Sequence, residues 1–117
     1  HGDSVVVEYI NNEMKLVEPD EKYQAATNFL LTPGDYDFGR GQDRYDTIIS
    51  TLKENNGVLS EEKAMNLLKE VSQQPHQTNS GRSSSTQWSV VYNNTQLTAT
   101  ISMGMDYEHT YEIKLFE

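Results

Sequence analysis

The sequence contains no cysteine among its 117 residues. This absence excludes a disulfide framework, a thiolate metal site and a cysteine nucleophile within the chain. His76 has no Cys, His or acidic neighbour at ligand spacing, and His109 falls in a predicted terminal strand, where a structural role is expected. Asp35 and Asp37 lack the further spaced oxygen ligands that calcium requires. We therefore expect neither a metal ion nor a cofactor.

Basic residues are scarce, with 9 Lys and Arg against 18 Asp and Glu, and the formal net charge is −9. Because phosphate binding depends on Lys and Arg, we expect neither nucleic acid nor an anionic membrane as a partner. No apolar run approaches the ~18 residues of a membrane span, and the N-terminus lacks a signal-peptide pattern. A cytoplasmic location is the expectation that follows.

The length allows a single domain, residues 1–117, with room for one modest core. The sequence begins His1-Gly2-Asp3 and enters almost at once the apolar run 5–7. This start indicates either a boundary inside a longer protein or a residual tag followed by native sequence.

The first element is a predicted hairpin that turns at Asn11-Asn12, two residues suited to the positive φ angles of a tight turn. A two-residue loop there sets Tyr9 opposite Met14, Val7 opposite Leu16, and Glu8 opposite Lys15. One face of the hairpin is then apolar on both strands, and the other pairs opposite charges.

A strand is predicted over residues 24–31, where the apolar run 25–31 is broken only by Thr27 and Asn28. Burying an amide side chain costs about 1–3 kcal/mol unless it is partnered. Asn28 is therefore a candidate functional residue. The alternative is that Asn28 closes a turn where the strand ends, as Asn often does.

A helix is predicted from about Gln42 to Asn55-Asn56-Gly57, with an apolar stripe at i, i+3, i+4 and i+7. Arg44 lies at the edge of that stripe in the first turn, where the helix dipole favours acids rather than cations. Either Arg44 pairs with a neighbouring aspartate, or the local rule is broken because Arg44 has a function. The stripe consists of Tyr45, Ile48, Ile49 and Leu52.

The loop 32–41 contains three glycines and one proline in ten residues, which excludes regular structure. Its two aromatic residues, Tyr36 and Phe38, either wall a substrate pocket or pin the loop to the core. The residues alone favour neither reading.

A second helix is predicted after Ser60, a good N-cap that is followed by acidic residues in the first turn. Ala64, Leu67, Leu68 and Val71 repeat the amphipathic spacing. The two helices are expected to pack antiparallel as one layer on a sheet. Residues 73–85 contain no core residues and are predicted to be a flexible loop.

A second hairpin is predicted from strands 86–92 and 95–103, with its turn at Asn93-Asn94. That register sets Val90 opposite Leu97 and Trp88 opposite Ala99, which favours Trp88 as a core residue rather than a ligand platform. A last strand follows a turn at residues 104–106. The whole pattern is α+β with antiparallel β-hairpins and a two-helix layer.

Three short motifs together resemble the C-terminal part of the linear amide C–N hydrolases. They are Ala26-Thr27-Asn28, Arg44 at the start of a helix, and the strand Trp88-Ser89-Val90-Val91-Tyr92. This family includes choloylglycine (bile salt) hydrolases, penicillin V acylases and acyltransferases that act on penicillin precursors, all of the N-terminal nucleophile type. The resemblance runs from about Ser4 to Phe116.

The resemblance implies a fragment of a four-layer αββα fold whose nucleophilic Cys lies upstream of residue 1. In that family Asn28 matches an oxyanion-stabilising amide, and Arg44 matches a cation that opens the helix beside the nucleophile. A small-molecule amide would be the substrate of the full-length protein, with Tyr36 and Phe38 as candidate substrate-binding residues. Bile salt hydrolases and penicillin V acylases have a Pro closer after Thr-Asn and a much longer insertion before the Arg, whereas here Pro33 follows Asn28 by five residues. The chain is therefore closer to the compact acyltransferase-like branch, and bile salts and penicillin V are not inferred as substrates.

The alternative to the hydrolase is a non-catalytic, acidic α+β binding or interaction domain. If half of an αββα fold is missing, an apolar sheet face is uncovered and the chain is expected to self-associate, most simply as a homodimer. The candidate residues for that face are Val5, Val7, Tyr9, Met14, Leu16, Val90, Leu97 and Ile101.

Overall fold

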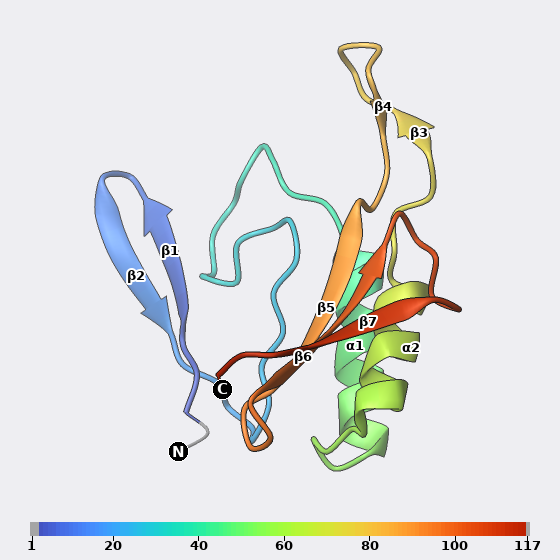
Figure 1. The fold of residues 1–117 in the computed structure, drawn as a ribbon. Helices are drawn as coiled ribbons and strands as arrows, with labels where there is room; N and C mark the ends of the chain where they lie inside the picture. Colours follow the sequence, from blue (N-terminus) through green and yellow to red (C-terminus); the bar gives the residue numbers. More distant parts are fainter. Residues whose placement is uncertain (1–2, 117) are drawn as a thin grey trace. The chain divides into compact units, whose positions relative to one another are not determined.

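The computed structural model describes residues 3–116 and has an α+β fold with antiparallel sheets, as predicted (Figure 1). The chain divides into two compact units, the first ending at Val58 and the second starting at Leu59. A single domain over residues 1–117 stays a prediction.

The first unit opens with the antiparallel hairpin of β1 (Val6–Ile10) and β2 (Glu13–Val17). Its predicted register is confirmed, since Tyr9 pairs with Met14 and Glu8 with Lys15. Asn11 and Asn12 have φ angles of 52° and 64°, as the two-residue turn requires. The register was predictable because the turn chemistry is local.

The burial of this hairpin reverses the usual pattern. The side chains of the apolar face, Val7, Tyr9, Met14 and Leu16, are all more than half exposed. Glu8, on the other face, is buried and accepts hydrogen bonds from Leu31 and Thr32. Lys15 lies opposite Glu8 in the hairpin, as predicted. Its ion pair, however, is with Glu13.

The predicted strand over 24–31 is wrong. Residues 24–31 form no ladder, and their β-pairing is a single bridge between Asn28 and Arg40. Asn28 is exposed rather than buried. An apolar run becomes a strand only when a partner strand supplies its hydrogen bonds, and here the chain turns away into the loop 32–41, which has no regular structure, as predicted.

Helix α1 (Gln42–Glu54) closes the first unit within the predicted bounds. Asn56 and Gly57 follow with φ angles of 54° and 74°, and the Gly57 amide donates to the Leu52 carbonyl at 2.7 Å. A Cβ atom at Gly57 would lie 2.8 Å from a ring carbon of Tyr23. Glycine is thus required here both for the left-handed turn and for packing of that ring.

The second unit begins with α2 (Glu61–Glu70), capped as predicted by the Ser60 hydroxyl, which accepts from the Lys63 amide at 3.2 Å. Met65 and Leu67 are its buried residues, and the helix packs against β5. Because α1 and α2 belong to different units, the two-helix layer stays a prediction.

Residues 73–85 are more ordered than predicted. Strands β3 (His76–Gln77) and β4 (Ser83–Ser84) form a short antiparallel ladder. The turn between them is closed by the Gly81 amide on the Thr78 carbonyl and by the Thr78 amide on the Arg82 carbonyl, both at 2.8 Å. A hairpin that relies on its own turn needs no core residues, so the sequence carries no periodic signal for it.

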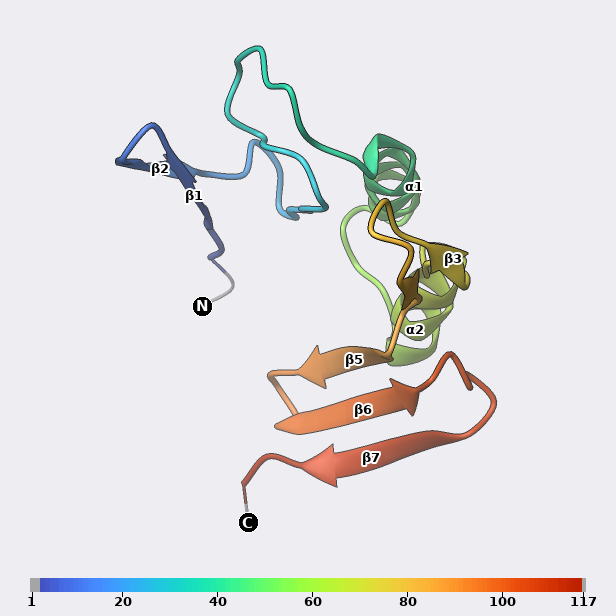
Figure 2. The same ribbon diagram turned by 90° about the horizontal axis from the view of Figure 1, so that it is seen from above.

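A three-stranded antiparallel sheet follows, in the order β5 (Trp88–Asn93), β6 (Thr98–Met103) and β7 (Thr110–Lys114) (Figure 2). The predicted register of its first hairpin is wrong: Val90 pairs with Ile101, and Trp88 with Met103. The Asn93 side chain accepts from the amides of Thr95 and Gln96, and this turn extends the loop to Leu97.

The prediction that Trp88 lies in the core is also wrong, because its side chain is 63% exposed. In both units the core is small. Among the described residues the buried apolar side chains are those of Ala25, Met65, Leu67 and Ala99.

Candidate functional site

The candidate site lies at the neck of the loop 29–39 in the first unit. The neck is closed by two hydrogen bonds of 2.9 Å, from the Arg40 amide to the Asn28 carbonyl and from the Thr27 hydroxyl to the Gly41 carbonyl. The chain then enters α1 directly from Gly41. This closure brings the start of the helix back to Asn28.

Asn28 and Arg44 are in direct contact, which confirms that they lie near each other. The Arg44 guanidinium donates through Nη2 to Oδ1 of Asn28 at 2.6 Å. A guanidinium can only donate, so the amide atom that it meets must be the oxygen. The bond therefore fixes the orientation of the Asn28 amide and directs its NH₂ donors away from Arg44.

Gly41 makes room for this contact. Its φ angle is 87°, and a Cβ atom at this position would lie 2.5 Å from Nη2 of Arg44. Any other residue would have to displace the guanidinium and would also be strained in the left-handed region. Sequence analysis missed this role, although a glycine directly before a helix, where a capping side chain is common, is a recognisable signal.

Two aromatic rings support the pair from adjacent positions in the chain. Phe29 follows Asn28, Tyr45 follows Arg44, and their rings meet edge to face with centroids 5.2 Å apart at 75°. This is a favourable aromatic geometry. The contact ties the segment that carries Asn28 to the helix that carries Arg44.

The loop aromatics Tyr36 and Phe38 contact each other, with ring centroids 5.8 Å apart. The Tyr36 hydroxyl donates to the Thr32 carbonyl at 3.1 Å, so this ring fixes the loop to itself. Phe38 is 67% exposed. A role for either ring in binding substrate stays a prediction.

A cavity of about 300 Å³ lies beside these elements, between residues 17–31 and α1. Its apolar walls include Ala25, Leu31, Tyr45 and Ile49, whereas Asn28 and Arg44 do not line it. The expectation that the two polar side chains face a common cavity therefore stays a prediction.

Glu8 holds the segment just beyond the candidate pair, and sequence analysis missed this role. Its carboxylate accepts from the amides of Leu31 at 2.6 Å and Thr32 at 2.9 Å, and from the Thr32 hydroxyl at 2.6 Å. Burial raises the pKa of Glu8, but these hydrogen bonds together outweigh it, so the pKa lies below its ordinary value of 4.5. The signal that could have predicted this role is an acidic residue in the middle of an apolar strand.

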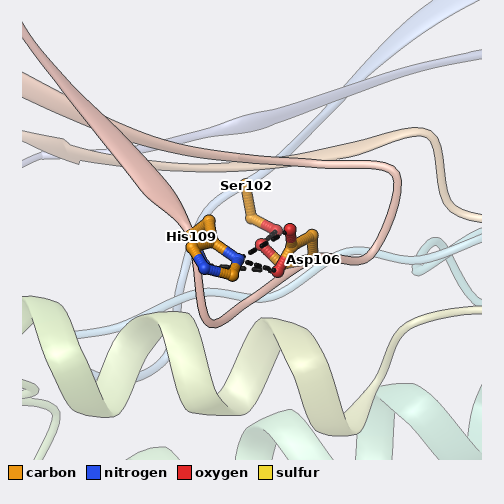
Figure 3. Close-up of polar contacts among 3 residues, drawn as sticks. All are labelled: Ser102, Asp106 and His109. Carbon is orange, nitrogen blue, oxygen red and sulfur yellow. Dashed lines mark hydrogen bonds and ion pairs between the residues drawn. The ribbon is translucent and has the colours of Figure 1, made fainter.

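Serine, aspartate and histidine also come together in the second unit (Figure 3). Nδ1 of His109 lies 3.0 Å from the Asp106 carboxylate, and this hydrogen bond lowers the pKa of Asp106. Ser102, however, donates to the backbone carbonyl of Asp106 at 3.0 Å and is fully buried. The three residues therefore close the turn between β6 and β7 and do not form a nucleophile–base pair.

Metal ligands do not gather in the part of the chain that the structure describes. Within residues 3–116 no three His, Cys, Asp or Glu side chains come together in a way that could hold a metal ion. Over the same residues, neither helix has the length and apolar character needed to cross a membrane.

Comparison with known proteins adds no relative. No protein-family model matches the chain, and no curated protein or solved structure matches it significantly.

Proposed function

We propose that this chain is the C-terminal part of a linear amide C–N hydrolase or acyltransferase of the N-terminal nucleophile type. The observation that carries the proposal is the hydrogen bond between Arg44 and Asn28. An exposed amide whose oxygen is held by an arginine presents its N–H donors in a fixed direction, as an oxyanion site needs. The resemblance of the surrounding motifs to that family gives the reaction class.

In the proposed reaction, a cysteine thiolate from outside these residues attacks the carbonyl carbon of a linear amide. The carbonyl oxygen becomes an oxyanion and accepts a hydrogen bond from Nδ2 of Asn28. When the tetrahedral intermediate collapses, the C–N bond breaks, the amine leaves with the proton that a general base outside these residues has taken from the thiol, and an acyl-enzyme remains. Water or an acceptor amine then takes the acyl group and releases the thiol.

Arg44 has two roles in this proposal. Its bond to Oδ1 withdraws electron density from the Asn28 amide and makes the N–H groups better donors. Its positive charge, close to the reacting atoms, lowers the pKa of the thiol and stabilises the developing oxyanion. Neither role of Arg44 requires a cofactor.

The fold in this proposal rests on the resemblance, and the substrate contacts and the location rest on the sequence. The fold would be part of an αββα sandwich, and the loop aromatics Tyr36 and Phe38 would contact a small-molecule amide substrate. The absence of cysteine pairs supports a cytoplasmic location, because secreted domains of this size often rely on disulfides.

The sharpest test is Asn28→Asp in the full-length parent protein, assayed against a panel of N-acyl amino acids and β-lactams. Aspartate keeps an oxygen for Arg44 to bind but removes both N–H donors. We expect kcat to fall about 100–1000-fold, the usual cost of losing one oxyanion donor. Arg44→Lys, which keeps the charge and loses the fork geometry, should also lower kcat.

Arg40→Ala is the matched control, since Arg40 lies at the same neck and its bond to Asn28 uses only the backbone amide. This variant should keep its activity. If Asn28→Asp retained full activity against a substrate that the parent hydrolyses, the proposed oxyanion role would be wrong.

The second candidate is a non-catalytic binding domain, and the exposed apolar sheet residues favour it. Val7, Tyr9, Trp88 and Tyr111 are each more than half exposed. The first two lie on β1 in the first unit and the last two on the sheet of the second unit, and an exposed apolar sheet face of either kind marks an interaction site in soluble proteins. The residues upstream in the parent gene discriminate between the two candidates: a Cys directly after an initiator Met or processing site favours the hydrolase.

A further inference from the structure

The sheet β5-β6-β7 in the second unit has one polar and one apolar face. Paired strands place directly opposite residues on the same face, and side chains alternate along each strand. On the polar face, Val91 is the one apolar side chain of these three strands. The apolar face consists of Trp88, Val90, Tyr92, Ala99, Ile101, Met103, Tyr111 and Ile113.

The polar face is covered over β5 and β6, whereas its β7 residues Thr110, Glu112 and Lys114 are exposed. Ser102 is fully buried, and Ser89 and Thr98 are each 8% exposed. The Glu61 carboxylate at the start of α2 accepts from Asn93 at 2.6 Å and from Thr100 at 3.5 Å, and both residues lie on this face. Figure 2 shows α2 beside β5, against which it packs.

Five large side chains of the apolar face are exposed and come from all three strands, whereas Ala99 is buried and Val90 and Ile101 are half-buried. The exposed fractions are 63% for Trp88 and Tyr92, 62% for Tyr111, 53% for Met103 and 48% for Ile113. Within these strands, no Asp, Glu, Lys or Arg lies on this face. An isolated sheet in water favours apolar residues on its covered face and polar residues on its exposed face. Over β5 and β6 this arrangement is reversed.

The area involved matches that of a stable interface. These five side chains together expose on the order of 700 Å², more than the typical largest apolar patch of a monomer. Two such faces in contact would remove on the order of 1,400 Å² from water, which lies in the standard range for specific protein interfaces. A small ligand would cover only part of the face.

We propose that the apolar face of β5-β6-β7 binds the same face of a second copy of this chain, in a two-fold dimer. A two-fold axis through the middle row of Val90, Ile101 and Tyr111 places the row of Trp88 and Met103 over the row of Tyr92 and Ile113 of the other copy. Both faces are then covered at once, and the assembly closes without leaving a face to extend it.

Charge supports this geometry. Each copy has a formal net charge of −9, so two copies repel each other, and an interface between them must keep its ionised groups outside. The face without charges meets that requirement. The dissociation constant should therefore fall when salt screens the repulsion, whereas binding of a basic partner would weaken.

The test is sedimentation equilibrium of the full chain, with Tyr111→Lys and Met103→Lys as interface variants. We expect a dimer with a Kd in the micromolar range or tighter, and at least about a 30-fold higher Kd for Tyr111→Lys, as for loss of a central aromatic contact. Both variants change exposed side chains, and circular dichroism checks their folding. Val58→Lys, which makes the same charge change at an exposed apolar position outside the sheets, is the matched control and should leave Kd unchanged.

Trp88 provides a second readout, because it is the only tryptophan in the sequence and lies in the proposed interface. Its emission should shift to longer wavelength on dilution below Kd, and the same shift should be present at all concentrations in Tyr111→Lys. A strict monomer at about 100 μM, well above the micromolar Kd of a standard interface, would overturn the proposal. The proposal would also be overturned if Trp88 were shielded in the monomer, if Val58→Lys weakened the dimer as much as Tyr111→Lys, or if association were weaker at high salt.

Discussion

At the scale of single residues, the carboxylate of Glu8 binds Leu31 and Thr32, which lie 23 and 24 residues further along the chain, and so joins β1 to that segment. Three donors converge on it, and glutamine could satisfy fewer of them while adding two donors of its own. We expect Glu8→Gln to destabilise the first unit by about 1–3 kcal/mol at neutral pH, the cost of unsatisfied buried groups. Hydrogen exchange of the Leu31 and Thr32 amides by NMR measures this directly.

The effect depends on pH with a definite sign. Because folding lowers the pKa of Glu8 below 4.5, its contribution is fully present above that value and is lost as pH falls through the lowered pKa. The difference between wild type and Glu8→Gln should therefore shrink at low pH. Glu13→Gln is the control, since its ion pair with Lys15 is exposed and of little energetic weight. A difference that grew on acidification would contradict the assigned role of Glu8.

The candidate pair shows what single-residue reasoning can and cannot achieve. Asn28 and Arg44 could be placed together because a short loop separates a polar residue from the start of a helix. The bond between them, and the need for Gly41, depend on a guanidinium conformation that no sequence pattern encodes. The Glu8 contacts were missed because they join residues that are distant in the chain.

At the scale of elements, Ser60 illustrates a feature that the sequence specifies locally. Its hydroxyl satisfies the Lys63 amide at the first turn of α2, where the helix supplies no acceptor. We expect Ser60→Ala to lower the free energy of unfolding of the second unit by about 1 kcal/mol, and Ser60→Asp to retain it. Urea denaturation followed by Trp88 fluorescence measures both. If Ser60→Ala left the free energy of unfolding unchanged, α2 would be stabilised by its packing on β5 and not by the cap.

The elements that could be predicted are those whose determinants are close in the chain. Both helices and the first hairpin follow from caps, periodicity and the turn Asn11-Asn12. The second hairpin could not be registered correctly, because the Asn93 side chain builds a longer turn than the two adjacent asparagines suggest. The strand over 24–31 failed because it depended on a partner elsewhere in the fold.

At the scale of the whole molecule, hydrophobic pattern predicted which residues share a face but not which face is buried. In the sheets β1-β2 and β5-β6-β7, most large apolar side chains of one face are exposed, whereas the polar residues Glu8 and Ser102 of the other face are buried. Pattern analysis assumes that apolar faces find cover within the same chain, and Trp88 was assigned to the core on that assumption. If a second molecule covers an apolar face, the hydrophobic pattern identifies that face correctly, but assigning its residues to the core of the same chain is wrong.

The last prediction also concerns the whole molecule: this chain alone should hydrolyse no amide. It contains no cysteine, and its closest approach to a catalytic triad pairs Asp106 with His109 but leaves Ser102 buried and bonded to a backbone carbonyl. An oxyanion donor without a nucleophile binds charge but cannot form an acyl-enzyme. The purified chain, incubated with N-acyl amino acids and β-lactams, should release no amine above the rate of buffer. Turnover that survives repurification and thiol alkylation, and that is lost in His109→Ala, would show that the second unit holds a nucleophile of its own and that the site in the first unit is not the catalytic one.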